Sequence, residues 1–520
     1  MTRQKSEDHI VPKGRVTAVR TPEHSGTVGG KVVPVDETVA QFELELVTAE
    51  NLSRTSLKSR ADRSVFEGQE VPKAEARRER SGPATMDEVV AALGSAAKKV
   101  VANKGAAGPD GESVEQLKEG WARIEPRLKR RLLKGEFRPG KIRRVMIPKA
   151  GGGERGLGIP NVIDRVVQEA IRQVLDLQYE PTFHGSSHGF RPGRSCHTAI
   201  DEAKEYVEAG LEWVVDLDLE KFFDRVHQQR LMSKLAQRVE DKRLLILLGQ
   251  ILRAKVVMPD GTEVKTLEGV PQGGPLSPLL SNVVLDELDK ELERREHKFV
   301  RYADDVNIFV KSRRAGERVL ASVTRFLESK LRLEVNKEKS AVGRPSDRSF
   351  LGFRLVRDKK SQKVEIMLSE RTRVRLAEKI RELTPRNWGG SLRRCIERVN
   401  RYLVGWHGFF GVVADKESTW TLDTVDAHIR RRLRAIVLKH WKRKRTMARN
   451  LMKLGVSRGL AWRSVYKGRT AIWALSISAA AHLGLRNRHF AEQGLLSLGD
   501  RHRDHWLNKV APAQLSFELE

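Results

Sequence analysis

The stretch FVRYADDVNIFV, from Phe299 to Val310, constrains the fold of this 520-residue chain more than any other segment. Two adjacent carboxylates, Asp304 and Asp305, lie inside a run of apolar and β-branched residues, which predicts a β-hairpin with both aspartates at its turn. Like charges side by side repel each other, and their burial adds a desolvation cost. An ordinary solvated turn avoids that cost, because aspartate is common in turns. In a buried turn, a cation has to offset it.

A second strand with a carboxylate precedes this hairpin. The segment WVVDLDLEKFFDRV (213–226) begins as a strand and places Asp218 at its end. If this strand neighbours the hairpin in one sheet, three carboxylates converge and should bind hard divalent cations, with Mg²⁺ as first choice. Two such ions about 4 Å apart can activate an attacking oxygen and stabilise a leaving one in phosphoryl transfer. Asp216 points to the same face, and we interpret it as a supporting carboxylate.

The order of the expected elements indicates two structural classes along the chain. Strands and helices alternate with mixed connections up to about residue 365, which predicts an α+β domain, and the pattern beyond it is almost all helical. Ser195 is expected to cap one helix and Ser277 to begin another, and 428–455 reads as a single amphipathic helix. We divide the chain into a weakly ordered N-terminal extension, a first domain, a helical domain and a tail: 1–84, 85–365, 366–500 and 501–520.

The charge distribution predicts a polyanionic partner. The chain carries a formal net charge of +29. Between Arg371 and Arg469 there are 26 Lys and Arg against 7 Asp and Glu, so the excess is concentrated in the helical part, as phosphate binding requires. The only cysteines, Cys196 and Cys395, are too few for a disulfide framework or a cysteine-built endonuclease module. Without an apolar run long enough for a bilayer or a signal sequence, we expect a cytoplasmic protein with no membrane partner.

Seven blocks occur in the order typical of one family. They are IPKAGGGERGLGIP, SHGFRPGRSCHTAI, WVVDLDLEKFFDRV, EGVPQGGPLSPLLSNVVLDELDKELE, FVRYADDVNIFV, VNKEKSAV and FLGF. Over roughly residues 85–500 the chain resembles group II intron-encoded reverse transcriptase/maturases. The resemblance implies a right-hand polymerase fold, with fingers and a palm built on an antiparallel sheet in 85–365. It also implies an α-helical thumb or maturase (X) domain in 366–500.

The resemblance assigns the metal-binding roles. Asp218, Asp304 and Asp305 match the catalytic triad of the family, and Asp218 and Asp304 are expected to bridge two Mg²⁺ ions. The backbone carbonyl of Leu219 would add a ligand, and Asp305 would contribute charge more than coordination.

The resemblance also assigns residues to the incoming nucleotide. Lys149 and Arg155 flank the glycine turn of the fingers hairpin, where a triphosphate needs cations, and Arg143 would assist them. Phe223 matches the steric gate that rejects a 2′-hydroxyl, and Gln272 would face the nascent base pair. Lys339 is a candidate to assist the leaving pyrophosphate. Each of these residues also has a plainer interpretation, as an exposed charge or a core side chain. The chain has Arg-Gly-Leu-Gly at 155–158 where the family often has Arg-Pro-Leu-Gly.

The basic thumb is expected to lie along RNA. Seven side chains are predicted to contact phosphates: Arg430, Arg431, Arg432, Lys442, Arg443, Lys444 and Arg445. Trp462 and Trp473 are interpreted as core residues rather than base-stacking platforms. For Arg191 and Arg194 two interpretations stay open, contact with the template and support of the fingers.

These features together predict an RNA-directed DNA polymerase. Its partners would be group II intron RNA, an RNA template with a DNA primer, dNTPs and target DNA; the sequence does not indicate an oligomeric state. The protein would assist splicing and retromobility in a bacterial cytoplasm, without its own His/Cys endonuclease. Two alternatives remain, a domesticated reverse transcriptase acting in DNA repair or defence, and a splicing chaperone with an inactive polymerase.

Overall fold

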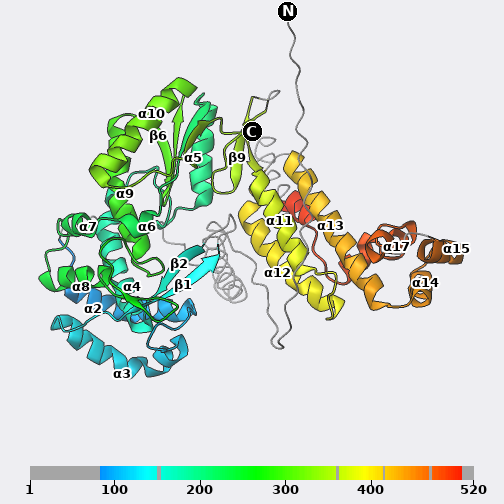
Figure 1. Ribbon diagram of the computed structural model, residues 1–520, viewed down its shortest axis with the longest axis horizontal. Coiled ribbons are helices and arrows are strands. Elements are labelled where there is room, and N and C mark those ends of the chain that lie inside the picture. The colour runs from blue at the N-terminus through cyan, green and yellow to red at the C-terminus, as the bar shows by residue number, and fades with distance from the viewer. Residues whose placement is uncertain (1–81, 149–153, 359–361, 414–415, 468–470, 506–520) are drawn as a thin grey trace, which may run out of the picture.

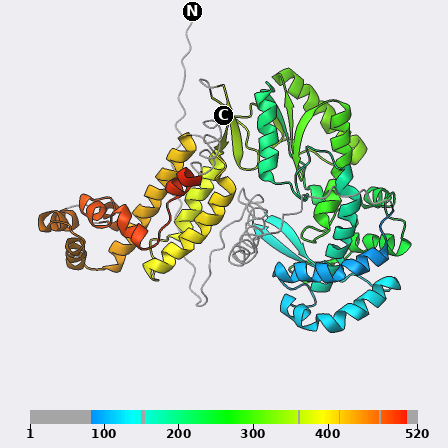
Figure 2. The same cartoon turned by 180° about the vertical axis from the view of Figure 1, so that it is seen from behind.

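The computed structural model (Figure 1) describes five ranges of the chain: 82–148, 154–358, 362–413, 416–467 and 471–505. Lys149, nearly all of the expected extension 1–84 and most of the expected tail 501–520 lie outside these ranges. Figures 1 and 2 show a larger body of helices around sheets beside a smaller, helical body. Within the five ranges, no helix combines the length and the apolar character that crossing a membrane requires.

The N-terminal part of the larger body combines helices with a small sheet. The helices are α2 (Met86–Ala102), α3 (Val114–Leu133) and α4 (Val162–Tyr179), followed by the 3₁₀ turn η2 (Glu180–Thr182). Thr85 and Ser113 each form a reciprocal capping box, which satisfies free amides at the starts of α2 and α3. The sheet has the order β2-β1-β4-β5 and contains β1 (Ile142–Pro148), β2 (Glu154–Ile159), β4 (Val256–Val257) and β5 (Glu263–Val264). The antiparallel pair β1–β2, called the fingers hairpin below, confirms the strands expected from the sequence.

A second sheet, called the palm sheet below, lies in the part of the larger body away from α2 and α3 (Figure 1). It has the order β6-β7-β3-β8, with antiparallel neighbours, and contains β3 (Trp213–Leu217), β6 (Lys298–Tyr302), β7 (Asp305–Val310) and β8 (Ala341–Gly343). Its two faces enter different hydrophobic cores, because Val214 belongs to one core and Val215 to the other. Burial on both faces explains why the strands of the opening stretch read as nearly continuous apolar runs.

Some helices of this body pack against the palm sheet, and others lie between it and the N-terminal helices (Figure 1). They are α5 (Cys196–Glu208), α6 (Phe222–Arg225), α7 (Gln228–Leu235), α8 (Lys242–Leu252), α9 (Ser277–Arg294) and α10 (Arg313–Phe326), which continues into the π-helical turn η3 (Leu327–Leu331). Two predicted helix starts are confirmed. Ser195 caps α5 by accepting a hydrogen bond from the amide of Thr198, and α9 begins at Ser277 with proline in its first turn.

The next elements join the two bodies. They are the antiparallel strands β9 (Phe353–Arg357) and β10 (Val364–Leu368), then α11 (Glu370–Leu383), α12 (Leu392–Phe410) and α13 (Lys416–His440). A single hydrophobic core contains Phe309 of the palm sheet, Phe353 of β9 and Leu433 of α13. The palm sheet and the helices α11–α13 are therefore packed as one structure.

Most of the last helices share a core of their own, whereas Phe490 of the final one packs in the core that contains Leu433. They are α14 (Lys444–Lys453), α15 (Arg458–Trp462) with the π-helical turn η4 (Arg463–Lys467), α16 (Ile472–Leu475), α17 (Ala479–Gly484) and α18 (Asn487–Glu492). A separate cluster joins Leu451 and Leu475 to the last turns of α13. The single helix expected over 428–455 is wrong. Trp441 packs against both neighbouring cores, and Lys442 takes a positive φ of 54°, which turns the chain between α13 and α14.

Candidate active site and nucleic-acid surface

The three catalytic candidates lie at one end of the palm sheet. β3 pairs with β7 up to its last residue, so Asp218 stands directly where the ladder stops. In the adjoining hairpin Tyr302 pairs with Asp305, which leaves Ala303 and Asp304 as the two turn residues. Ala303 has a positive φ of 57°, as tight hairpin turns require. The structure therefore brings the carboxylates of Asp218, Asp304 and Asp305 to the same sheet end.

The carboxylates at this sheet end repel one another. Burial raises the pKa of Asp305 well above its usual range, and three neighbouring carboxylates raise it further: those of Asp216, Asp304 and Asp218. Burial also raises the pKa of Asp216 to about 6, with a smaller contribution from Asp218. The cost inferred from the sequence is thus present in the fold, and Asp216 shares in it.

Two basic side chains partly balance this negative charge. Lys339 Nζ lies 3.6 Å from Asp218 Oδ2, and Arg348 Nη1 lies 3.9 Å from Asp216 Oδ2. The pairing places Lys339 beside Asp218, and its role with pyrophosphate stays a prediction. Arg348 was not singled out from the sequence.

The backbone at Leu219 leaves its carbonyl outside the local ladder. Leu219 pairs with Val335 in an isolated antiparallel bridge, and the hydrogen bonds on either side are made by the carbonyl of Asp218 and the amide of Glu220, each at 2.9 Å. In this pairing the carbonyl of Leu219 points away from Val335. This orientation is consistent with the ligand role that the resemblance implies.

The oxygen atoms at this sheet end are of the types that bind a divalent cation. Carboxylate and carbonyl oxygens are the ligands that Mg²⁺ prefers, and the mutual repulsion at Asp305 is relieved by positive charge. Among the described residues, no three His, Cys, Asp or Glu side chains already surround a common point as metal ligands.

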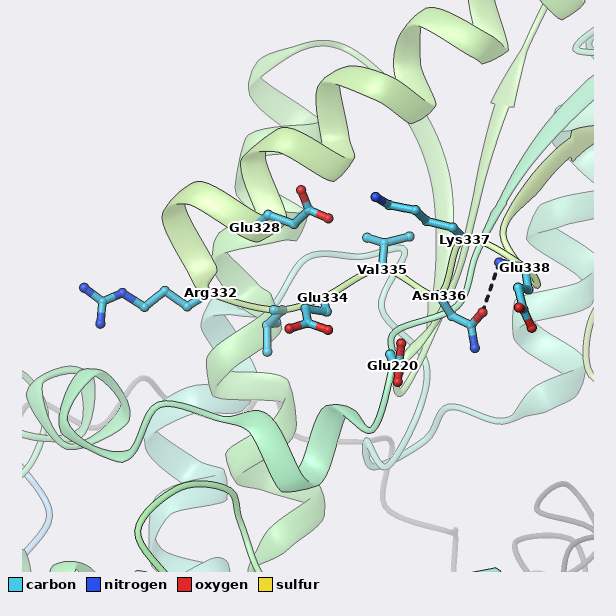
Figure 3. A pocket seen from close by; sticks show the side chains of 9 residues that line it. Glu220, Glu328, Arg332, Glu334, Val335, Asn336, Lys337 and Glu338 are labelled. Atoms are coloured by element: carbon cyan, nitrogen blue, oxygen red, sulfur yellow. Dashed lines mark hydrogen bonds between the residues drawn. The ribbon is translucent and has the colours of Figure 1, made fainter. Parts of the chain in front are cut away.

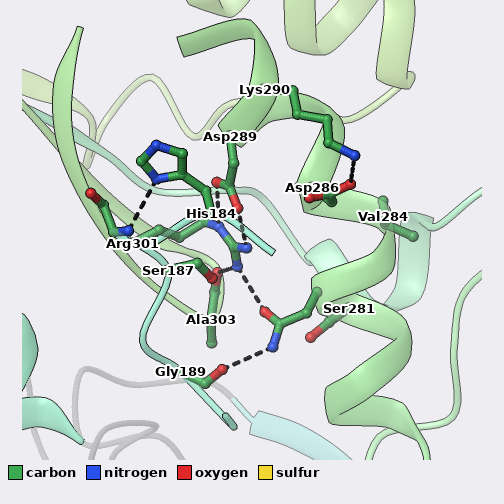
Figure 4. A network of polar contacts seen from close by, with 12 residues as sticks. His184, Ser187, Gly189, Ser281, Val284, Asp286, Asp289, Lys290, Arg301 and Ala303 are labelled. Atoms are coloured by element: carbon green, nitrogen blue, oxygen red, sulfur yellow. Dashed lines mark hydrogen bonds and ion pairs between the residues drawn. The ribbon is translucent and has the colours of Figure 1, made fainter. Parts of the chain in front are cut away.

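A buried polar network supports the turn from behind (Figure 4). Arg301 and Asp289 are fully buried and form a bidentate ion pair, with nitrogen–oxygen distances of 2.7 and 2.5 Å. Arg301 Nη1 also donates to the carbonyl of Ala303 at 2.9 Å and to Asn282 Oδ1 at 2.8 Å. Asn282 Nδ2 in turn donates to the carbonyl of Gly189 at 2.9 Å. The backbone next to Asp304 is therefore fixed from the core.

Close packing adds to this support. A Cβ at Gly189 would lie 2.2 Å from the amide nitrogen of Ala303, so only glycine allows the segment 186–189 to touch the turn. Sequence reasoning missed the roles of Arg301, Asn282 and Asp289. Two signals were present in the sequence. Arg301 is a charged residue inside an apolar strand, and Asn282 and Asp289 lie seven residues apart among the buried apolar residues of α9.

The nucleotide-binding candidates form two linked contacts. Arg155 Nε donates to Gln272 Oε1 at 3.0 Å, and the amide of Gly158 donates to the carbonyl of Gln272 at 2.6 Å, which ties the fingers hairpin to the loop before α9. Phe223 lies at the rim of the core, 9 % exposed, and its carbonyl accepts from the amide of Val270 at 2.7 Å. The loop 269–272 therefore contacts both Phe223 and the fingers hairpin.

Arg143 contacts another part of the fingers. Its Nη2 donates to the carbonyl of Ala107 at 2.7 Å, in the glycine-rich loop 105–111. The structure thus places this guanidinium against that loop. Whether Arg143 also contacts a nucleotide remains a prediction.

The unusual Gly156 has a local explanation. Arg144 lies across β2 at this point, and a Cβ at Gly156 would come within 1.9 Å of Arg144 Nε. Arg144 Nη2 lies 3.6 Å from Asp224 Oδ1, next to Phe223. Glycine therefore makes room for an ion pair between the fingers hairpin and the short helix α6.

The structure separates the two interpretations of Arg191. The side chain is buried, pairs with Glu180 at 3.0 Å and donates to the carbonyls of His184 and Ser187. Arg191 therefore supports the fold. Arg194 lies nearer the surface and donates to the carbonyl of Gly185.

The predicted RNA contacts divide by exposure. Four are exposed at the turn between α13 and α14: Lys442, Arg443, Lys444 and Arg445. Arg430 and Arg431 are half-buried. Arg432 is buried, and its guanidinium donates to the carbonyl and hydroxyl of Thr384, so the structure gives it a supporting role rather than a place on the surface.

The two tryptophans also differ in their surroundings. Trp462 stacks on Tyr466, with ring centroids 5.0 Å apart, and packs against the core of α14–α17. Trp473 lies beneath two guanidinium groups.

A pocket around Val335, the residue that pairs with Leu219, has the wrong charge for a nucleotide (Figure 3). Its volume is about 810 Å³, and four glutamates line it: Glu220, Glu328, Glu334 and Glu338. These carboxylates would repel a triphosphate. The candidate site is therefore the sheet end with Asp218, not this pocket.

The chain matches two families in adjacent segments. Residues 147–355 match the family described as "Reverse transcriptase (RNA-dependent DNA polymerase)", and residues 374–455 match "Group II intron, maturase-specific domain". The first match contains the palm sheet and the three aspartates, and the second contains most of α11 through α14.

Three relatives agree with these matches. Protein YkfC of Escherichia coli (strain K12) is 33% identical over 348 residues, which cover 59% of this chain and 89% of YkfC. The COX1/OXI3 intron 2 protein of Saccharomyces cerevisiae is 29% identical, over 53% of this chain and 38% of that protein. Group II intron-encoded protein LtrA of Lactococcus lactis subsp. cremoris is 30% identical, over 47% of this chain and 50% of LtrA. With a palm sheet, a thumb that matches the maturase-specific domain, and these relatives, the chain belongs to the group II intron-encoded reverse transcriptase/maturases, a family of RNA-directed DNA polymerases.

Proposed function

We propose that this chain copies RNA into DNA at the end of the palm sheet. Asp218 and Asp304 would hold two Mg²⁺ ions, with the carbonyl of Leu219 as a further ligand and Asp305 adding negative charge. When bound, the ions would activate the primer 3′-hydroxyl and neutralise charge on the phosphates. The observation that carries the proposal is the convergence of repelling carboxylates from β3 and the β6–β7 turn, which raises the pKa of Asp305.

The surrounding residues would bind and orient the nucleotide. Arg155 would contact the triphosphate together with Lys149, which lies outside the described residues. Gln272, already bonded to Arg155, would support the base pair, and Phe223 would exclude a 2′-hydroxyl. Lys339 lies beside Asp218 and would donate a hydrogen bond to the departing pyrophosphate.

The catalytic proposal is tested by primer extension. The full chain should incorporate dTTP on poly(rA) with an oligo(dT) primer and MgCl₂, and Asp304→Ala should lower the rate by roughly 10³-fold, because several kcal/mol of charge stabilisation is lost. Asp201→Ala, at an exposed position on α5, is the control and should keep the rate. Incorporation that survives Asp304→Ala would contradict the assignment.

We also propose that the helical part binds group II intron RNA and assists splicing and retromobility. The matched maturase-specific segment and the exposed basic residues at the turn between α13 and α14 support this proposal. The division into a polymerase domain over 85–365 and a maturase domain over 366–500 belongs to it. The test is the affinity for intron RNA relative to a random RNA of equal length at moderate salt. Equal affinities would contradict it.

A further inference from the structure

Three basic side chains contact one tryptophan between α11, α13 and α16, and two further arginines lie close to the histidine among them. We call this group the Trp473 cluster; its members are Arg381, Arg386, His428, Arg431, Arg432 and Trp473. The guanidinium carbon of Arg431 lies 3.9 Å from the Trp473 ring centroid, and that of Arg386 lies 4.5 Å from it. The indole therefore holds two cations close together through cation–π contacts, which occupy faces that a base would need.

The Trp473 cluster has no acidic partner in the described part of the chain. Its arginines form no ion pair there, whereas arginines elsewhere on the same body do: Arg393 lies 3.2 Å from Glu397, and Arg488 lies 2.8 Å from Glu492. Arg432 is held by backbone and hydroxyl oxygens at Thr384. Guanidinium groups gathered without a counter-ion repel one another, and partial burial strengthens that repulsion.

Two buried atoms of the cluster lack a hydrogen-bond partner among the described residues. They are Arg431 Nε and His428 Nε2. Burial lowers the pKa of His428, and nearby arginines, Arg432 first among them, lower it further. The site is therefore strongly positive, with hydrogen-bonding capacity that the protein does not use.

We propose that the Trp473 cluster binds a phosphodiester group of a nucleic-acid backbone, an inference that rests on the nucleic-acid binding proposed above. A phosphate carries the missing negative charge, and its oxygens match the planar donors of arginine. Trp473 lies beyond the segment that matches the maturase-specific domain, whereas Arg386 and Arg431 lie inside it. The site would thus couple α16 to the matched helices through a bound strand.

The test compares a double variant with a double control of equal charge in the full chain. R386Q/R431Q removes the two cations over Trp473, and R393Q/R488Q removes two exposed, ion-paired cations. The probes are a fluorescein-labelled RNA hairpin and a DNA hairpin of the same sequence, with the dissociation constant measured by anisotropy across KCl concentrations.

We expect R386Q/R431Q to weaken binding about tenfold. The plot of log affinity against log salt should become shallower by about 1, since one phosphate contact is lost. The control should show neither change. An effect on RNA alone identifies RNA as the occupant, and an effect on DNA alone identifies DNA. R386Q/R431Q could instead lower the melting temperature and leave the slope of log affinity against log salt equal to that of the control. The cluster would then only stabilise the packing of the helices, and the proposal would be overturned.

A second measurement uses the unaltered chain. Phenylglyoxal modification of the exposed Arg386, followed by mass spectrometry, should slow several-fold when the hairpin is bound, while Arg313 on α10 should react at an unchanged rate. Equal rates at Arg386 with and without the hairpin would overturn the site. If the unaltered chain binds neither hairpin, the failure lies with the proposed nucleic-acid binding itself.

Discussion

At the scale of single residues, the aspartates of the palm sheet illustrate a conflict between stability and chemistry. Asp305 is surrounded by three other carboxylates, and burial adds to their effect. Such a site lowers the stability of the ion-free protein, because every charged form is disfavoured. A bound cation would reverse the balance. The same carboxylates that destabilise the empty fold would then bind the ion.

This conflict predicts the behaviour of Asp305→Asn. In EDTA the substitution should raise the melting temperature by about 2 °C, because a repelling charge is removed from a buried position. It should also make the melting temperature less sensitive to MgCl₂ and strongly reduce dTTP incorporation. Thermal unfolding with EDTA and with MgCl₂ measures the first two effects. A variant less stable than the wild type in EDTA would show that the repulsion is already compensated.

The sequence indicates that these aspartates converge at one sheet end, but it does not reveal the residues that support them. The aspartates and Lys339 come together at one end of the palm sheet, because a motif records which residue types chemistry needs at fixed spacing, and Arg155 contacts Gln272 in the fingers. Arg432 was expected on the surface and is buried, since a run of arginines does not show which member faces the core.

At the scale of elements, the β6–β7 hairpin depends on α9. The buried pair of Arg301 and Asp289 joins them, and Asn282 connects the pair to Gly189 on the neighbouring segment. A buried ion pair is costly unless every donor is satisfied. Here the extra bonds to Asn282 and Ala303 use those donors, so the network positions the turn that carries Asp304.

We therefore expect Asn282→Ala to affect both stability and chemistry. Two hydrogen bonds are lost, and the carbonyl of Gly189 stays buried without that donor, which should cost about 1–3 kcal/mol of the free energy of unfolding. The turn would then hold Asp304 less firmly, so kcat should fall while the KM for dTTP stays near its wild-type value. Steady-state kinetics with folded protein checks this. Ser281→Ala on the same helix is the control. A change in stability without a change in kcat would limit the network to a structural role.

Helix boundaries that depend on tertiary packing were not predictable. The stretch 428–455 contains no proline, its only glycine is at the very end, and its apolar periodicity is continuous, so one helix was expected. The break follows Trp441, whose ring is shared by two cores. A sequence pattern can show that an aromatic residue is buried, but it cannot show that the residue packs against two different cores.

At the scale of the whole molecule, the last described residues pack back onto the helices of the thumb. His407 on α12 is buried and lies with its ring centroid 5.8 Å from those of His502 and His505. Burial lowers the pKa of His407 to about 4, and Arg501 and the two other histidines lower it further. Protonation of His407 would therefore oppose the packing of 498–505 on α12.

This arrangement predicts a loss of stability in acid. The pKa of His407 is about 6.5 in the unfolded chain and about 4 in the folded one, so the unfolded state takes up the proton first. Stability should fall as pH drops from 6.5 towards 4, by about 2 kcal/mol from this residue at pH 4.5. His407→Phe should lose correspondingly less stability between pH 7 and pH 4.5. Melting temperatures at both pH values measure the difference, and the buried aspartates contribute equally to both proteins. Identical pH dependence would contradict the assignment.

The single core that joins the palm sheet to α11–α13 fixes the position of these helices relative to Asp218. Moving these helices away from Asp218 would expose apolar surface that now includes Phe309, Phe353 and Leu433. In the proposed reaction, α11–α13 would therefore keep a constant distance from Asp218, whichever duplex of template and primer binds. Duplexes of different width would have to be accommodated elsewhere, by the fingers hairpin or by the helices that follow His440. The enzyme would thereby discriminate between duplexes by their width, independently of their base sequence.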